Sequence, residues 1–398
     1  MNRGDVDKEK ISPMMRQYLD IKEKYSDTII FYRLGDFYEM FFEDAITASR
    51  ELELTLTGRN AGLEERVPMC GVPHHAYLSY LDKLVEKGYK VAICEQMTDP
   101  KTTKGMVERD VVQVVTKGTR IDAFLNEKDS NYLGSVYDFE YCYGISFTDI
   151  TTGYVYTLII EHDKNKLVKE IAKRNILEII VNDKLDREII NTLRGNYNIL
   201  VTITDELYEE NDYEFVYKNI SDIRNVTCIK HLLAYIINTK KGDLSHLQQA
   251  EIINSEEFLS FDVHTKRNLE LTETLRTKDR TYSLLWLLDK TKTAMGSRYL
   301  KYNIENPLTD IEEINRRYSI IETLLNEFIL KEDLQRELDK VYDLERLAGR
   351  IAYGNLNARD LIQLKNSLSA LPSIHEILKE IKYSKNVETL DELFVLLD

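Results

Sequence analysis

The chain has 398 residues, of which 43% are hydrophobic and 30% are charged, a composition typical of globular proteins. This length exceeds what one hydrophobic core usually serves, so two or three domains are predicted. No apolar run approaches the roughly 20 residues of a membrane span, and the first residues lack the apolar stretch of a signal peptide. The four cysteines are scattered without C-x-x-C spacing or a histidine partner, which favours reduced thiols in a cytoplasm.

The formal net charge of −15 argues against a protein coated for phosphate binding. The acidic excess is concentrated in residues 126–258, which carry 14 basic and 23 acidic residues. The two flanking regions are closer to balance, and each could present a basic face. The charge therefore disfavours a nucleic-acid partner without excluding one.

The N-terminal elements are organised around the stretch Ile29–Glu43. A helix is predicted over residues 11–25, and it is followed by a strand at Ile29–Tyr32. Gly35 and Asp36 form a two-residue turn signal before a second apolar run. Alternation along that run places Phe37 and Glu39 on one face, which suits a flat partner that offers a hydrogen-bond donor. The alternative is a pair of ordinary strand residues at a sheet edge.

Further elements complete a small α/β unit. The segment 67–75 has two prolines around a glycine, which predicts a rigid turn rather than a helix or a central strand. Adjacent His74 and His75 have no third ligand nearby, which favours a helix cap or a packed imidazole over a metal site. The remaining predicted elements are helices at Glu43–Leu54 and Ala76–Lys87 and strands at Lys90–Gln96 and Val111–Thr116.

A second unit begins near Asn131 with three strand-like runs that form a meander. Asp149 ends the second run. On a ribonuclease H-like sheet it would be a candidate metal ligand, but no second carboxylate is evident on the neighbouring runs. We therefore expect Asp149 to form a turn by bonding local backbone groups. The predicted elements are strands at Leu133–Val136, Cys142–Asp149, Tyr154–Ile160, Leu177–Val181 and Leu200–Thr204, with helices at Lys164–Arg174 and Asp186–Leu193.

From Ser221 onwards the sequence is strongly helical, with leucine and isoleucine at helical spacing. The short connections predict antiparallel neighbours and a scaffold. The predicted helices are Val226–Asn238, His264–Leu275, Ser283–Leu288, Ala294–Ile304, Ile311–Asn326, Lys331–Lys340, Leu344–Ala352, Ala358–Ala370 and Ser373–Lys382.

Several enzyme motifs are missing from the 398 residues. The sequence has no G-x-x-x-x-G-K-[ST] phosphate loop, no G-x-S-x-G elbow and no convincing Cys–His pair. The last helices end without a cap motif, which leads us to expect a chain cut within a longer polypeptide.

Motifs spread in collinear order along the chain resemble the MutS family of DNA mismatch-repair proteins. The resemblance is carried by FYRLGDFYE at Phe31–Glu39, PMCGVPHH at Pro68–His75, AICEQ at Ala92–Gln96, DP at Asp99–Pro100, VER at Val107–Arg109, VVTKGT at Val114–Thr119, DITTG at Asp149–Gly153, RNLE at Arg267–Glu270, MGSR at Met295–Arg298 and DLERL at Asp343–Leu347.

The resemblance implies a multidomain α/β plus all-α chain in three parts. These are a small mixed α/β mismatch-recognition domain at residues 1–122, a ribonuclease H-like connector at 130–250, and a truncated start of the helical core at 260–398. Family members continue into lever helices, a DNA clamp and an ATPase domain with the main dimer interface. This chain departs from the family by lacking them, so no catalytic activity is expected of it.

The family's recognition residues carry over to five positions. The resemblance implies that Phe37 inserts into the minor groove and that Glu39 hydrogen-bonds the displaced base. Arg59, Met69 and Arg109 match positions near the DNA. The structural alternatives are a solvent-exposed loop arginine for Arg59, core filling for Met69 and a surface ion pair for Arg109.

The implied partners are double-stranded DNA with mismatches or small loops and a MutL-type protein at the connector. No cofactor, metal or membrane is expected for this chain. An intact bacterial, cytoplasmic parent would bind ATP and Mg and form a homodimer. Two other functions stay open: a metal-dependent nuclease centred on Asp149, and a helical scaffold or partner-docking fragment with too few DNA contacts. We expect weak, strongly salt-dependent DNA affinity.

Overall fold

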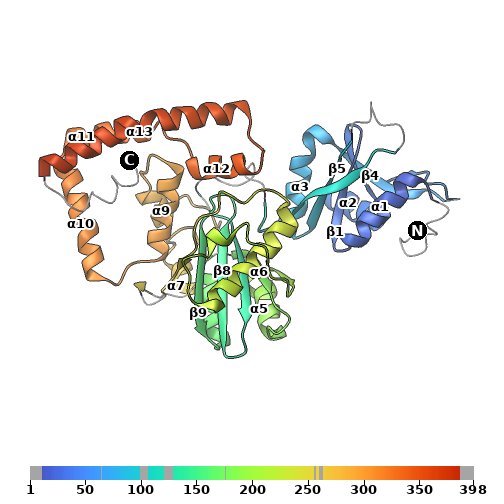
Figure 1. The fold of residues 1–398 in the computed structure, drawn as a ribbon, viewed down its shortest axis with the longest axis horizontal. Helices are drawn as coiled ribbons and strands as arrows, with labels where there is room; N and C mark the ends of the chain where they lie inside the picture. Colours follow the sequence, from blue (N-terminus) through green and yellow to red (C-terminus); the bar gives the residue numbers. More distant parts are fainter. Residues whose placement is uncertain are drawn as a thin grey trace.

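The computed structural model describes residues 11–63, 65–98, 106–120, 128, 130–174, 176–254, 257–259 and 263–385. A mixed α/β region is followed by a helical region, and Figure 1 shows three parts. We call them the N-terminal part (residues 11–120), the central part (130–254) and the helical part (263–385). The N-terminal part lies to the right, the central part below, and the helical part to the left and above.

The N-terminal part is a six-stranded sheet in the order β3-β4-β2-β1-β5-β6. Strands β1 and β2 are antiparallel, with Leu34 opposite Phe37, so Gly35 and Asp36 form the predicted two-residue turn. β5 runs parallel to β1. The strands are β1 (Thr28–Leu34), β2 (Phe37–Phe41), β3 (Thr57–Arg59), β4 (Val67–Pro73), β5 (Lys90–Gln96) and β6 (Arg109–Val115).

Helices cover both faces of this sheet. Helix α1 (Pro13–Lys24) begins with Ser12, whose hydroxyl accepts a hydrogen bond from the Met15 amide at 3.4 Å. It packs on the face that carries Ile30, Tyr32 and Phe41. Helices α2 (Phe42–Leu52) and α3 (Tyr77–Glu86) pack on the other face, against Phe31, Tyr38 and Met40 among others. The alternation of buried side chains therefore gives this sheet two separate cores.

The prediction of a rigid turn over residues 67–75 is wrong, because β4 is an interior strand of the sheet. Its ladder with β2 runs from Met69, opposite Phe41, to Pro73, opposite Phe37. Pro73 closes the β2–β4 ladder and Pro68 lies outside it, opposite Gly58 in the short β3–β4 ladder, so neither proline interrupts the interior of the β2–β4 ladder. His74 and Ala76 bound a short 3₁₀ turn that leads into α3.

The central part has a second six-stranded sheet in the order β11-β10-β7-β8-β9-β12. The predicted meander is confirmed: β7, β8 and β9 are successive antiparallel neighbours. β10 runs parallel to both β7 and β11. The elements are β7 (Tyr132–Asp138), β8 (Cys142–Asp149), β9 (Val155–Glu161), α4 (Lys164–Lys173), β10 (Ile176–Val181), α5 (Arg187–Tyr197), β11 (Leu200–Ile203), α6 (Ile223–Lys240) and β12 (Glu251–Ile252).

Two histidines of the central part are hydrogen-bonded within the fold: His231 is buried and His246 is partly buried. The His231 ring nitrogens lie 2.7 Å from the Ser135 hydroxyl and 2.7 Å from the Thr204 carbonyl oxygen. Nε2 of His246 lies 2.7 Å from the Ile150 carbonyl oxygen. Burial lowers the pKa of both imidazoles below the ordinary value. Protonating either ring therefore costs more in the folded chain than in the unfolded one.

We expect the central part to lose stability between pH 7.5 and pH 5.5. The unfolded chain binds protons near pH 6.5 and the folded chain only at lower pH, so stability is fully present above 6.5 and falls below it. The loss is up to about 1.4 kcal/mol for each histidine at pH 5.5. Denaturant unfolding at both pH values measures it. His231→Gln should reduce the difference and His75→Gln, at an exposed ring, should not; equal pH dependence in both variants would contradict this assignment.

The helical part contains seven helices among the residues described. One prediction fails here: residues 358–385 form the single helix α13 rather than two, with Pro372 inside it. The predicted helix over 264–275 is also shorter, because α7 ends at Asn268 and Glu270 adopts a φ of +48°. The helices are α7 (Val263–Asn268), α8 (Leu284–Leu288), α9 (Ala294–Glu305), α10 (Ile311–Asn326), α11 (Phe328–Leu338), α12 (Leu344–Ala352) and α13 (Ala358–Lys385). None of the helices in the described ranges is long and apolar enough to cross a membrane.

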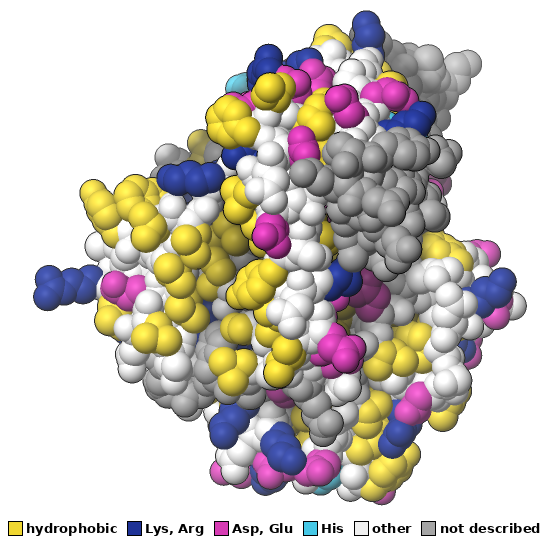
Figure 2. Space-filling view, turned by 90° about the vertical axis from the view of Figure 1, so that its left-hand side faces the viewer, with side chains coloured by type: hydrophobic (Ala, Val, Ile, Leu, Met, Phe, Trp, Pro, Cys, Tyr) yellow, Lys and Arg dark blue, Asp and Glu magenta, His cyan; other side chains and the backbone are white. Residues whose placement is uncertain are grey.

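Apolar side chains are exposed over the outer face of the helical part (Figure 2). Neither α10 nor α11 has a buried residue. We call this surface the outer apolar face and define it by Ile311, Tyr318, Ile321, Leu325, Phe328 and Ile329, which are each more than half exposed. A surface with this many exposed apolar side chains is suited to protein contact.

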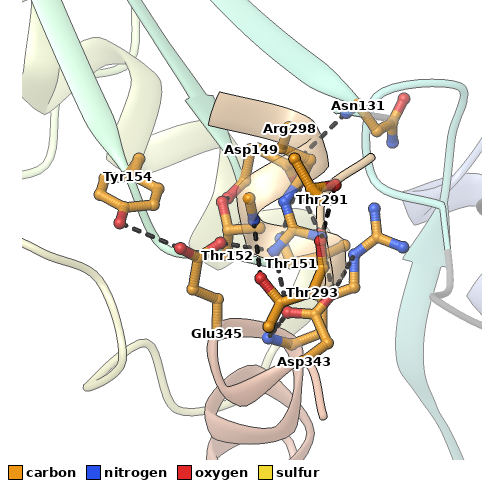
Figure 3. Close-up of polar contacts among 12 residues, drawn as sticks. Asn131, Asp149, Thr151, Thr152, Tyr154, Thr291, Thr293, Arg298, Asp343 and Glu345 are labelled. Atoms are coloured by element: carbon orange, nitrogen blue, oxygen red, sulfur yellow. Dashed lines mark hydrogen bonds and ion pairs between the residues drawn. The ribbon is translucent and has the colours of Figure 1, made fainter. Parts of the chain in front are cut away.

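A polar cluster joins the central part to the helical part (Figure 3). Arg298 of α9 donates hydrogen bonds of 2.6 and 2.8 Å to Asp343 and one of 2.5 Å to Glu345. Tyr154, which precedes β9, donates to the same Glu345 carboxylate at 3.1 Å. The Arg298 side chain is only 7% exposed. One buried guanidinium thus holds α9, α12 and the central part together.

Backbone contact makes this junction tighter. A Cβ atom built on Gly349 of α12 would lie 2.7 Å from the carbonyl oxygen of Thr151. Any side chain at Gly349 would therefore push α12 away from the loop that follows β8.

Candidate nucleic-acid interface

Phe37 is the first residue of β2 and lies at the tip of the β1–β2 hairpin. Its side chain is 48% exposed, whereas Tyr38 beside it is 1% exposed. Gly35 has a φ of +56°, a conformation that glycine adopts without steric cost. The backbone amide of His74 also donates to the Asp36 carbonyl at 2.8 Å, which ties the hairpin tip to the end of β4. The ring is thus presented to solvent on a well-supported turn.

Glu39 lies two residues along β2, on the same face as Phe37, and forms an ion pair with Arg59 of β3. β4 separates these two strands, and the residue of β4 opposite Glu39 is Gly71. A Cβ built on Gly71 would lie 3.5 Å from Cγ of Glu39. Arg59 reaches across β4 to the Glu39 carboxylate. The Glu39 carboxylate is therefore neutralised within the chain.

Arg109 begins β6 and is held by internal hydrogen bonds. Its guanidinium donates to the carbonyl oxygens of Arg33 at 2.8 Å and Val107 at 2.9 Å. It also lies over the Tyr32 ring, 5.1 Å from the ring centre. Tyr32 stands opposite Glu39 in the β1–β2 ladder. Arg109 is thus fixed beside the Phe37 face, and its contacts are not those of a surface ion pair.

Met69 is partly buried and packs against the core beneath α1. It pairs with Phe41 in β2 and with Thr57 in β3. This position supports the floor of the face that Glu39 and Arg59 share. The structure therefore brings Glu39, Arg59 and Met69 together, with Arg109 on the far side of Tyr32.

The opposite face of the hairpin is locked to β5. The Tyr38 hydroxyl donates to the Glu95 carboxylate, and the Arg33 guanidinium lies 3.9 Å from the same group. Burial raises the pKa of Tyr38 and the Glu95 hydrogen bond raises it further. His74 stacks on Tyr77 with ring centres 5.9 Å apart, consistent with the packed imidazole predicted for it. Because these contacts occupy the opposite face, only the Phe37 face of the hairpin is open to a binding partner.

The groove beside Arg109 is not positively charged overall. Its volume is about 730 Å³. Three basic residues and three acidic residues line it, namely Arg16, Lys24, Arg109, Asp20, Glu108 and Asp110. A groove with balanced charges offers no track for a phosphate backbone.

Asp149 forms the predicted turn. Its carboxylate accepts hydrogen bonds from the Asn131 amide at 3.0 Å, the Thr151 amide at 3.0 Å and the Thr151 hydroxyl at 2.7 Å. Both of its oxygens are therefore occupied by the chain itself. Within the described ranges, no group of three or more His, Cys, Asp or Glu side chains is arranged to hold a metal ion.

Sequence reasoning missed a second buried carboxylate, Glu178, on β10. It accepts hydrogen bonds from the Tyr235 hydroxyl at 2.5 Å and the Gly118 amide at 2.9 Å. The Asn131 side chain donates to the Gly118 carbonyl at 3.4 Å, which links Glu178 to the neighbourhood of Asp149. The signal was an acid inside an otherwise apolar run, Ile176–Val181. Its observed role is to anchor the segment that leaves the N-terminal part.

Three family models match this chain. They are MutS domain I over residues 12–123, MutS domain II over 131–248 and MutS domain III over 264–397. The chain is also 47% identical over 367 residues to DNA mismatch repair protein MutS of Bacillus cereus (strain G9842), Bacillus mycoides (strain KBAB4) and Bacillus thuringiensis (strain Al Hakam). Each alignment covers 92% of this chain and 41% of the relative. The chain thus spans about 41% of the length of these curated relatives.

Proposed function

Because the chain belongs to the MutS family, we propose that it recognises mismatched or unpaired bases in double-stranded DNA during mismatch repair. The observation that carries this proposal is the half-exposed Phe37 ring at the tip of a supported hairpin. An apolar side chain held outside the core is suited to wedge between base pairs from the minor groove.

The proposed selectivity comes from the cost of deforming the duplex. Insertion of Phe37 unstacks a base step, which costs a few kcal/mol and less where pairing is already defective. A mismatch is then detected as the weaker place in the helix, and the sequence around it is not read. This mechanism needs few base contacts.

Glu39 and Arg59 act together in this proposal. An unpaired carboxylate beside phosphates would repel all DNA, and the ion pair with Arg59 reduces that repulsion. Glu39 keeps acceptor capacity for a donor on the displaced base. Arg59 stays close enough to turn toward a phosphate when the base takes its place. The pair thus lowers the affinity for all DNA but increases the difference in affinity between mismatched and matched duplexes.

Glu39→Ala should tighten binding to a fully matched duplex and narrow the preference for a mismatched one. The substitution frees Arg59 for phosphate contact, which we expect to raise matched-duplex affinity by up to about fivefold, the worth of an exposed ion pair. Competition binding with a matched duplex and a G–T mismatched duplex measures both effects.

The matched control is Glu43→Ala, which removes the same charge from α2. It should leave the mismatch preference unchanged. If Glu39→Ala weakens binding to both duplexes equally, or if Glu43→Ala reproduces its effect, the proposed role of Glu39 is wrong.

The partner-docking alternative has support of its own in the outer apolar face. We expect that surface to meet another protein segment rather than DNA, because apolar side chains offer nothing to phosphates. The nuclease alternative receives no such support, since both carboxylate oxygens of Asp149 already accept hydrogen bonds from backbone amides or a hydroxyl.

We further infer that the central part is a ribonuclease H-like connector. The supporting feature is its sheet, with three antiparallel strands followed by two strands parallel to the first. The family relationship supports a MutL-type partner for this connector. For a full-length parent, it supports binding of ATP and Mg and formation of a homodimer. For this chain alone, we propose no enzymatic activity. Four free, buried cysteines fit a bacterial cytoplasm.

A further inference from the structure

A cavity lies between the β7–β8–β9 sheet and helix α9, at the junction of the central and helical parts. It has two adjoining lobes that share Ser130, Tyr132, Arg298 and Tyr302. The larger lobe, which we call the tyrosine lobe, has a volume of about 260 Å³. We call the other the cationic lobe. Cavities between domains are common positions for small ligands.

Aromatic side chains form one wall of the tyrosine lobe and extend into the cationic lobe. Tyr132 of β7 meets Phe147 of β8 edge to face at 5.4 Å, and Phe147 stacks on Tyr156 of β9 at 5.2 Å. Tyr154 continues the row, stacked on Tyr156 at 6.3 Å. The facing wall of the tyrosine lobe is α9, which contributes Tyr302 and the exposed Tyr299. Aromatic walls on two sides favour a flat, aromatic ligand.

The cationic lobe is lined by Lys173, Arg174, Arg298 and Lys301 against one acid, Glu305. Arg174 is engaged by Glu170 and Arg298 by Asp343 and Glu345. For Lys173 no ion pair or hydrogen bond is found among the residues that the structure describes. Burial lowers the pKa of the Lys173 ammonium. The Glu170 carboxylate partly offsets this effect, and repulsion from Arg174 and Lys266 lowers the pKa further. An anion bound beside Lys173 would offset that repulsion.

The tyrosine lobe also offers hydrogen-bond acceptors. Glu251 and Glu345 line it, but Glu345 already accepts from Tyr154 and Arg298. Glu251 is exposed on β12. A carboxylate at the edge of an aromatic slot suits an exocyclic amino group.

We propose that this cavity binds a free nucleoside phosphate whose base carries an exocyclic amino group. The base lies among the tyrosines with its amino group toward Glu251, and the phosphate lies beside Lys173. This site is separate from the Phe37 face and does not depend on DNA binding. Because Tyr154, Arg298 and Glu345 form the junction itself (Figure 3), the ligand bridges the central and helical parts and stabilises their contact.

Isothermal titration of the full 398-residue chain with AMP tests the proposal. Adenosine and inorganic phosphate, titrated separately, should each bind more weakly than AMP. Lys173→Gln should weaken AMP binding by about tenfold or more, the loss of a charge-assisted hydrogen bond, and should leave adenosine binding unchanged. Lys169→Gln, on the same helix but exposed and outside the cavity, should leave both unchanged.

A second variant pair tests the aromatic wall. Tyr302→Leu should weaken both AMP and adenosine, whereas Tyr318→Leu on α10 should weaken neither. Saturation by AMP with these variant effects supports the proposal. It is overturned if AMP does not bind at millimolar concentration, if inorganic phosphate binds as tightly as AMP, or if Lys173→Gln and Lys169→Gln behave alike. Binding of a short single-stranded oligonucleotide but not AMP would overturn the assignment to a free nucleotide.

Discussion

Replacing Phe37 by alanine is expected to abolish the preference of this chain for mismatched over matched DNA. Loss of base–aromatic stacking, worth about 1–3 kcal/mol, should lower affinity for the mismatched duplex by roughly fivefold to 150-fold. Affinity for the matched duplex should hardly change, because the ring contributes nothing to phosphate contacts. Fluorescence anisotropy with both duplexes at one low salt concentration measures the two affinities.

The fold should survive this substitution. Phe37 is half exposed, and substitutions at such surface positions usually change the free energy of unfolding by less than about 0.5 kcal/mol. Phe328→Ala is the matched control, since Phe328 is an exposed phenylalanine on the helical part. If Phe37→Ala unfolds the N-terminal part, or if Phe328→Ala removes the mismatch preference equally, Phe37 is not the wedge.

Arg298→Ala should strongly lower the free energy of unfolding of the helical part. The substitution leaves Asp343 and Glu345 without their shared buried partner. Removing one member of a buried ion pair typically costs about 3–5 kcal/mol. The chain has a single tryptophan, Trp286 on α8, next to α9. Its fluorescence during denaturant unfolding therefore reports on the part that should weaken.

The control for this prediction is Arg336→Ala, which breaks an exposed ion pair with Asp333 on α11. Exposed pairs contribute about 0–1 kcal/mol, so that variant should unfold near the wild-type midpoint. Equal effects of the two substitutions would show that the Arg298 cluster does not hold the junction.

Local patterns predicted the elements whose signals lie within a few residues. The turn at Gly35 and Asp36 between two apolar runs gave the β1–β2 hairpin in its observed register. Alternation placed Phe37 and Glu39 on one face and Tyr38 on the other. By contrast, the two prolines of β4 led to the wrong prediction of a turn. Whether a proline interrupts a ladder depends on where the neighbouring strands end, which the local sequence does not show.

The contacts of the site residues depended on tertiary structure and could not be read locally. Arg59 pairs with Glu39 across β4, although the two residues lie on strands that are not neighbours in the sheet. Glu178 was missed because nothing within Ile176–Val181 indicates that the Gly118 amide and the Tyr235 hydroxyl meet it. Similarly, Pro372 suggested a break between two helices, but α13 is continuous through it. This helix packs against α11 and α12, contacts that the local sequence does not show.

A salt titration of binding to mismatched and matched duplexes of the same length tests the central claim most directly. We predict weak binding to both, with affinities that fall steeply and in parallel as salt rises, because phosphate contacts supply the shared part of the free energy. The ratio of mismatched-duplex affinity to matched-duplex affinity should stay above one and should change little with salt, because the preference comes from the uncharged Phe37 ring. A ratio of one at every salt concentration would contradict mismatch recognition by this chain.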